Sequence, residues 1–160
     1  MRKVVYLAVL ALVFTGLFRS DAAAQKSRKA VSASEATGTF RMEFTGKYKG
    51  TYNEIRLLPL GKGKIKMAFD LVYPFIDGAG EMSANIGQAE GIGTIDADVA
   101  VYENNEYGEC RIVIKFIRPG VIKVSSDDGD FACGFGHNVS AAGTYKRTSK
   151  MKPKFEDPNK

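Results

Sequence analysis

The stretch that decides the fold lies at residues 64–73 and has the sequence KIKMAFDLVY. Apolar side chains occupy every second position, and charged side chains fill most of the positions between them. Such alternation is typical of a β-strand with one face in a core and the other in water. We expect the inward set to comprise Ile65, Met67, Phe69, Leu71 and Tyr73.

Similar short runs recur on both sides of this stretch, separated by glycines and polar turns. They lie at residues 39–45, 51–60, 93–96, 98–102, 110–117, 121–126, 131–135 and 142–146. Residues 74–91 are rich in glycine, which predicts a long loop with at most one weak strand. No stretch has the period of an amphipathic helix. The sequence therefore predicts an all-β fold, a small antiparallel β-barrel of about eight short strands whose first and last strands pair.

Cys110 and Cys133 are the only two cysteines in the chain. In a protein that leaves the cytoplasm, two cysteines most simply form one disulfide bond. In the chain-entropy model, a disulfide between these two positions raises the free energy of unfolding by roughly 3 kcal/mol. A structural zinc site needs about four Cys or His ligands. Since His137 is the only histidine, the cysteines predict a disulfide that pins the barrel.

The first 24 residues have the three parts of a secretory signal peptide. Arg2 and Lys3 give it a positive start, and residues 4–18 form an uncharged, mainly apolar core. Alanines at residues 22–24 then offer a cleavage site. The apolar core is shorter than the roughly 20 residues of a membrane span. We therefore expect an exported chain, periplasmic or extracellular, with no transmembrane segment after cleavage.

Removal of residues 1–24 as a signal peptide leaves 136 residues, enough for one domain. We expect a flexible segment at residues 25–36, the barrel at 37–147 and a basic tail at 148–160. The whole chain has a net charge of +5, yet residues 30–145 carry 15 acidic and 11 basic side chains. This acidic body argues against a nucleic-acid-binding surface.

No catalytic constellation stands out in the chain. A Ser-His-Asp site would have to use His137, and no G-x-S-x-G motif is present. Asp96 and Asp98 would share one face of a strand, because side chains alternate along a strand. A carboxylate-based hydrolase is therefore kept as an alternative, while the expectation is a protein without enzymatic activity.

An acidic turn follows the strand expected at residues 121–126. Its carboxylates belong to Asp127, Asp128 and Asp130. Clustered carboxylate oxygens suit calcium, which makes the turn a weak candidate for this ion. The spacing differs from that of an EF-hand loop, and a solvated turn is the simpler interpretation. We expect no cofactor.

The most distinctive stretch lies at residues 131–147 and has the sequence FACGFGHNVSAAGTYKR. Together with Cys110 it resembles a group of small exported bacterial proteins that end in a Cys-Gly-Phe-Gly … Val … Ala … Gly-Thr-Tyr segment. The resemblance covers residues 37–147 and implies a disulfide-pinned β-domain without an assigned reaction. Within this stretch the candidate binding residues are His137, Asn138, Ser140, Tyr145 and Lys146.

A looser resemblance is to exported lysozyme inhibitors. One such family has a loop with the sequence Ser-Ala-Ser-Gly-Ala-Arg-Tyr, and residues 140–145 here are Ser-Ala-Ala-Gly-Thr-Tyr. Ala142 replaces the second serine, and the basic Lys146 follows the tyrosine instead of preceding it. The acidic body would suit a basic lysozyme through complementary charge.

These features favour an exported, non-enzymatic binding protein whose partner is another protein or a component of the cell envelope. An inhibitor of a secreted hydrolase such as lysozyme is the first alternative, and the carboxylate-based hydrolase is the second. The sequence leaves the oligomeric state open.

Overall fold

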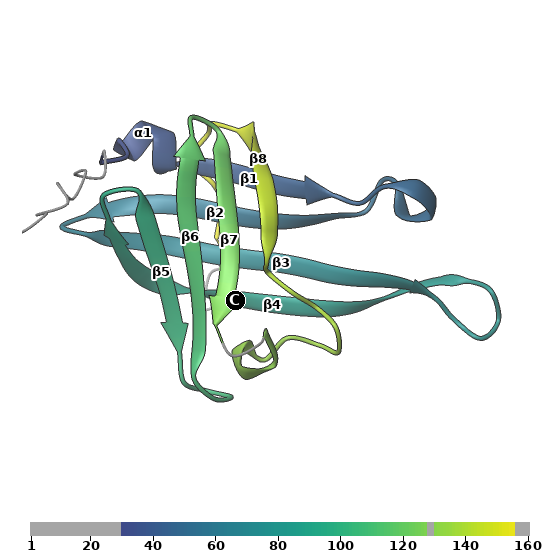
Figure 1. Cartoon of the computed structure of the whole chain (residues 1–160). Helices are drawn as coiled ribbons and strands as arrows, with labels where there is room; N and C mark the ends of the chain where they lie inside the picture. The colour runs from purple at the N-terminus through teal and green to yellow at the C-terminus, as the bar shows by residue number, and fades with distance from the viewer. Residues whose placement is uncertain (1–29, 128–129, 156–160) are drawn as a thin grey trace, which may run out of the picture.

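The computed structural model describes residues 30–127 and 130–155, and Figure 1 shows them as a β-barrel. Within these residues, eight strands and three short helices follow one another along the chain. The strands are β1 (Gly38–Glu43), β2 (Tyr52–Gly61), β3 (Lys64–Ile76), β4 (Met82–Asp96), β5 (Val99–Asn104), β6 (Cys110–Arg118), β7 (Val121–Asp127) and β8 (Gly143–Ser149). The helices are α1 (Ala33–Ala36) and the 3₁₀ turns η1 (Gly46–Tyr48) and η2 (Asp130–Cys133).

Each strand pairs in antiparallel fashion with its neighbour in sequence, and β1 also pairs with β8 to close the barrel. Closure gives the two end strands hydrogen-bond partners that an open sheet would deny them. In Figure 1, β5, β6 and β7 run across the direction of β2, β3 and β4. The prediction of a small antiparallel barrel of eight strands, with its first and last strands paired, is confirmed.

Large side chains from six of the eight strands fill the barrel interior. The largest fully buried ones are Phe40, Ile55, Leu57, Ile65, Met67, Phe69, Leu71, Ile112, Ile114, Ile122, Val124 and Tyr145. The ring centroids of Phe69 and Tyr102 lie 5.2 Å apart in an edge-to-face arrangement. The predicted inward set of β3 is correct except for Tyr73, which is 40% exposed because β3 has left the barrel at that point.

A disulfide joins Cys110, the first residue of β6, to Cys133 in η2, as the sequence predicts. After η2 the chain runs back over the barrel, where Phe135 and Val139 enter the core. The strand predicted at residues 131–135 is wrong. β5 and β7 occupy both edges of β6, so no edge of β6 is open for a further strand. The segment that the disulfide holds beside β6 forms the helical turn η2 instead.

Within residues 25–36, which the sequence predicts to be a flexible segment, the described part contains the short helix α1. Ser32 begins this helix with a capping box: the main-chain N–H of Glu35 donates to Ser32 Oγ at 3.2 Å, and the Glu35 carboxylate accepts from Ser32 N–H at 3.0 Å. Arg147 of β8 donates hydrogen bonds to main-chain carbonyls around the helix, the shortest at 2.9 Å. Residues 1–29, which include the expected signal peptide, lie outside the described residues.

The largest departure from the sequence prediction concerns residues 74–91. The sequence predicts a long loop there, but β3 continues to Ile76 and β4 begins at Met82. The two strands pair with each other up to Ile76 and Met82, on both sides of the turn at residues 77–81.

The glycines of β4 mislead because they lie at inner positions that have no room for a side chain. An added Cβ at Gly87 would lie 2.9 Å from the side chain of Phe135, and one at Gly91 would lie 2.9 Å from that of Tyr102. Glycine here permits close approach of other elements and does not mark a turn.

The described part of the predicted basic tail, residues 148–155, contacts the barrel. β8 extends two residues into this range, and the chain after it packs on the outside of the barrel. Pro153 is buried, and Arg56 Nη1 donates to the main-chain oxygen of Lys154 at 2.6 Å. The same guanidinium lies 5.9 Å from the ring centroid of Phe155. Residues 150–155 are therefore part of the folded domain.

Candidate binding surface

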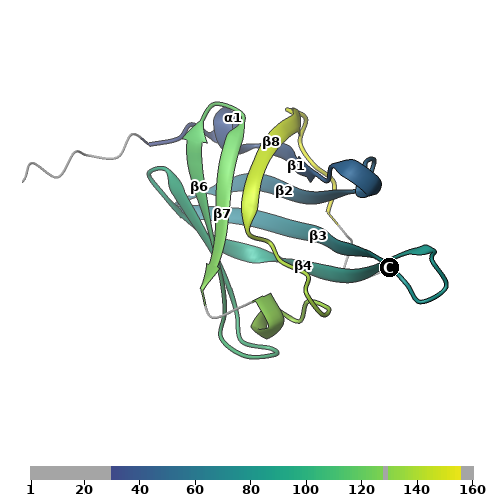
Figure 2. The ribbon, with the colours of Figure 1, turned by 45° about the vertical axis from the view of Figure 1, so that its right-hand side comes forward.

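β3 and β4 extend past the first residue of β2, Tyr52, as a two-stranded ribbon. We call residues 72–86 of this ribbon the arm. Its strands pair from Val72 with Ile86 to Ile76 with Met82, and residues 77–81 form its tip. Figures 1 and 2 both show the arm projecting beyond the other strands of the barrel.

One face of the arm consists of apolar side chains alone, and we call it the outer face because it continues the outside of the barrel. Side chains alternate along a strand, so the residues on this face are Val72, Pro74, Ile76, Met82, Ala84 and Ile86. Pro74 is buried and Val72 is half-buried, and the other four are exposed. Ile86 and Met82 are 63% and 62% exposed. Apolar groups gathered in this way on a soluble protein mark interaction sites.

At the foot of the arm, the outer face borders a shallow hollow of about 410 Å³. Tyr52, the first residue of β2, lines this hollow and is 39% exposed. The guanidinium of Arg41 lies 3.9 Å from the centroid of its ring. Asp70 and Gln88 also line the hollow, and Gln88 Nε2 donates to Asp70 Oδ1 at 3.1 Å. The apolar face thus has a polar rim, as protein interfaces commonly do.

The tip of the arm is ordered by Asp77. Its Oδ1 accepts hydrogen bonds from the N–H groups of Ala79 and Glu81, both at 2.9 Å. Its own N–H donates to the main-chain oxygen of Glu81 at 2.9 Å. A tip that is already ordered loses little conformational entropy on binding.

Asn53, the second residue of β2, lies next to the point where the pairing of β2 with β3 stops, at Glu54 and Asp70. It is 2% exposed, and its Oδ1 accepts from Val72 N–H at 2.8 Å. Its Nδ2 donates to the main-chain oxygen of Ser140 at 3.4 Å. The amide side chain thereby replaces the main-chain acceptor that continued pairing of β2 with β3 would give to Val72.

Three of the predicted binding residues lie in the segment before β8, next to the arm. His137 and Asn138 are exposed, and the main-chain oxygen of His137 accepts from Asn85 Nδ2 of the arm at 2.7 Å. Ser140 is half-buried, and its Oγ accepts from Ala142 N–H at 3.1 Å. The structure therefore places His137 beside β4 of the arm, whereas Ser140 lies beside Asn53 of β2.

The other two predicted residues lie elsewhere. Tyr145 is fully buried in the barrel, and its hydroxyl donates to the main-chain oxygen of Ala141 at 2.9 Å. Tyr145 therefore has no surface to offer a partner. Lys146 is exposed on β8, opposite Arg41 of β1.

The carboxylates considered for hydrolysis do not share a strand face. Asp96 ends β4, whereas Asp98 lies in the turn before β5. Ala97 between them has a φ of 50°, and the chain reverses there. The expected pairing of these two side chains on one face is therefore wrong.

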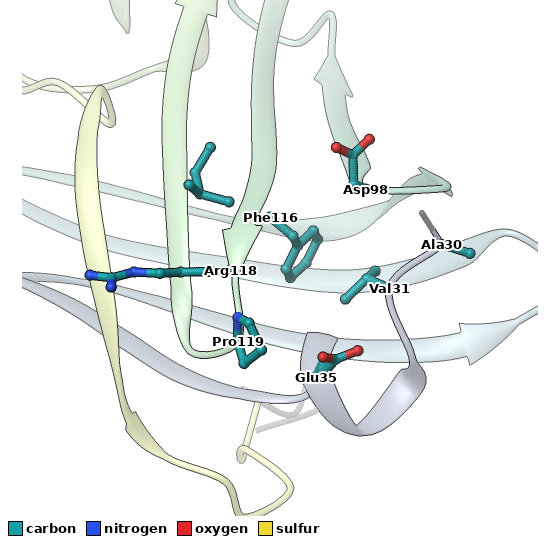
Figure 3. Close-up of a pocket in the computed structure, with 8 residues that line it drawn as sticks. Ala30, Val31, Glu35, Asp98, Phe116, Arg118 and Pro119 are labelled. Atoms are coloured by element: carbon teal, nitrogen blue, oxygen red, sulfur yellow. The ribbon is translucent and has the colours of Figure 1, made fainter. Parts of the chain in front are cut away.

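A hollow of about 220 Å³ lies beside this turn, and Figure 3 shows the residues around it. Val31 and Phe116 give it apolar walls, and Glu35 and Asp98 bring carboxylates. Glu35 Oε2 accepts from the N–H and the Oγ of Ser32, at 3.0 and 2.8 Å. This carboxylate thus belongs to the start of α1, and the hollow is where α1 meets the barrel.

The residues predicted as weak calcium ligands lie at or next to residues 128–129, which are outside the described residues. Asp128 lies outside the described residues, and so do the side chains of Asp127 and Asp130. Calcium binding at this turn stays a prediction.

The arm was missed although its sequence contains a strand pattern. Met82, Ala84 and Ile86 alternate with the polar Ser83 and Asn85. This alternation predicts a half-buried strand, but the glycines on both sides of it favoured a loop.

Comparison with protein-family models, curated proteins and solved structures gives no match to this chain. In the part of the chain that the structure describes, no helix is long and apolar enough to cross a membrane. The fold and the surface together define a closed eight-stranded barrel that carries a projecting ribbon with an apolar outer face.

Proposed function

We propose that this chain is an exported, non-enzymatic binding protein that docks a partner protein through the outer face of the arm. One observation carries the proposal: every side chain on that face is apolar, and its two largest on β4, Met82 and Ile86, are more than half exposed. Large apolar side chains near the centre of an interface supply much of its binding energy.

The filled interior of the barrel supports a role for the outer surface. The interior positions hold bulky side chains such as Phe40, Phe69 and Tyr145. Complete burial of a large apolar side chain contributes roughly 1.5–3 kcal/mol relative to exposure. Met82 and Ile86 still have most of this gain available to a partner.

Charge supports a protein partner over an anionic membrane. The only charged side chains of the arm are Asp77 and Glu81, and both are acidic. Carboxylates at the tip would be repelled by anionic lipid headgroups. They suit a partner whose contact surface is neutral or basic.

The export part of the proposal rests on two features. Residues 1–24 have the pattern of a signal peptide. The disulfide between Cys110 and Cys133 suits an oxidising compartment outside the cytoplasm.

Site-specific photo-crosslinking in the native host tests the proposal. A photoreactive residue at position 82 should form an adduct with a second protein, because Met82 lies on the outer face and is 62% exposed. The same residue at position 117 of β6 is the matched control, since Ile117 is 51% exposed but lies outside the arm. Mass spectrometry of the adduct identifies the partner.

The variant Ile86→Lys adds a second requirement. It places a charge on the outer face, so the adduct from position 82 should be lost. Ile92→Lys introduces the same charge at a site 59% exposed on the barrel part of β4 and should leave the adduct intact. Adducts only between copies of this chain, or equal adducts from positions 82 and 117, contradict the proposal.

A further inference from the structure

The two edges of the arm differ in the hydrogen bonds that they can offer. On β3, Val72 N–H points away from β4, because it donates to Asn53 Oδ1 at 2.8 Å. The direction of the backbone groups alternates along a strand of an antiparallel pair. Pro74 and Ile76 are therefore the next outward positions. Since proline has no N–H, the β3 edge lacks a donor that a neighbouring strand would need.

The β4 edge keeps its donors and acceptors. Ile86 C=O points away from β3, because it accepts from Gly136 N–H at 3.1 Å. By the same alternation, Met82 and Ala84 direct both their N–H and their C=O outward. Among the residues that the structure describes, neither has a hydrogen-bond partner on this side. Open strand edges of this kind are templates for pairing with another strand.

We infer that this edge pairs with the same edge of a second copy of this chain. In an antiparallel arrangement about a two-fold axis at Ser83, Met82 of one copy lies opposite Ala84 of the other. Each such pair exchanges both of its N–H···O=C hydrogen bonds. Pairing cannot continue toward the barrel, because Gly136 already occupies the edge at Ile86.

The charges of the arm favour a second copy in this register. Glu81 of one copy faces Asn85 of the other, so no carboxylate of one arm faces a carboxylate of the other. The exposed His137 adjoins Asn85 through a hydrogen bond of 2.7 Å. The acidic tip of each copy therefore meets an amide and a histidine, with no like-charge repulsion.

Pairing at this edge lies in the plane of the ribbon and leaves the outer face uncovered. It joins the outer faces of two arms into one apolar surface. This dimer goes beyond the proposed function, and it rests on the open edge of β4 instead of the apolar face. Two outward residues per copy make a contact far smaller than the roughly 800 Å² per partner of a standard stable interface. The dimer is therefore reversible and depends on concentration.

Sedimentation equilibrium of the purified chain, at concentrations up to about 1 mM, tests the inference. The native chain should show a reversible equilibrium between monomer and dimer. Ala84→Pro removes one outward N–H and should weaken dimerisation by at least about tenfold. Ala84→Val keeps that N–H and should dimerise like the native chain. Position 74, which pairs with position 84, already holds a proline, so the ribbon accepts this residue at an edge.

Two further measurements separate this inference from the proposed function. Ile86→Lys alters the outer face only, so it should leave dimerisation unchanged even where it abolishes cross-linking to a partner. Hydrogen exchange of the native chain needs no variant: the amides of Met82 and Ala84 should become protected as concentration rises. A chain that stays monomeric at every concentration, or a dimer that Ala84→Pro leaves unchanged, overturns the inference.

Discussion

The barrel part and the arm part of β3 and β4 belong to the same two strands, yet their outer faces differ in chemistry. In the barrel part the outer face is mainly polar, as at Asp70 and Gln88, which are hydrogen-bonded at 3.1 Å. In the arm it is apolar at every position. The change falls between one residue pair and the next, where Val72 and Ile86 follow Asp70 and Gln88.

This difference shows where the two strands leave the core of the barrel and where apolar side chains become exposed to solvent. In the barrel part, Phe69 and Leu71 are buried by side chains from the opposite wall. Among the described residues no strand lies opposite the arm, and Tyr73 is 40% exposed although it continues the inner face. Apolar side chains that folding does not bury add nothing to stability, so their presence points to a use in binding.

The largest predicted effect is the difference in free energy of unfolding between one alanine variant in the barrel part and one in the arm. Phe69→Ala should lower the free energy of unfolding by about 3–5 kcal/mol, because it leaves a cavity beside Tyr102. Ile86→Ala in the arm should change it by less than about 0.5 kcal/mol, since the side chain is already exposed. Urea unfolding of both variants measures the two values. Similar losses would show that the arm is part of the stabilising core.

The junction between the two parts should give an intermediate effect. Asn53→Ala leaves Val72 N–H and the Ser140 carbonyl without their buried partner, which should cost roughly 1–3 kcal/mol. The Val72 amide should also exchange faster with solvent, because it loses its acceptor. Asn85→Ala is the control: it removes a more exposed hydrogen bond and should cost about 0.5–1.5 kcal/mol. An unchanged Val72 exchange rate would contradict a role for Asn53 in holding the arm.

The smallest predicted effect is a change of stability in alkaline solution. Burial raises the pKa of the Tyr102 phenol above its ordinary value of 10.0, and the hydrogen bond with Asn104 opposes this shift. Unfolding returns the phenol to its lower pKa, so the unfolded chain loses this proton first as pH rises. The stability from this group is complete below about pH 10 and is lost as pH rises through the raised pKa of the folded state.

Tyr102→Phe should therefore make the free energy of unfolding fall less steeply above about pH 10 than in the native chain. Urea unfolding at several alkaline pH values measures this slope. Tyr73→Phe in the arm is the matched control, because that ring lies outside the core. Equal slopes for the native chain and Tyr102→Phe would show that the phenol does not contribute.

The sequence predicted the barrel part well because its pattern is local. Large apolar residues at every second position of 65–71 identify a strand with one buried face whatever lies beyond it. The two cysteines likewise predicted their own pairing, since no other cysteine competes.

The candidate surface was predicted only in part. Local sequence placed His137 and Asn138 on an accessible segment, and the structure sets that segment beside the arm. It also suggested Tyr145, whose burial depends on strands that are distant in sequence.

The sequence by itself determined an all-β chain with a closing pair of end strands and one disulfide, because alternation, turn residues and cysteine count are properties of short segments. Only the tertiary structure decided that residues 74–91 form strands and that they carry the exposed apolar face. The reason is physical: Gly87 and Gly91 are small because Phe135 and Tyr102 pack against them from elsewhere in the chain. An apolar side chain is buried only where strands on the opposite side of the barrel pack against it. Those strands are distant in sequence and come together only in the folded barrel.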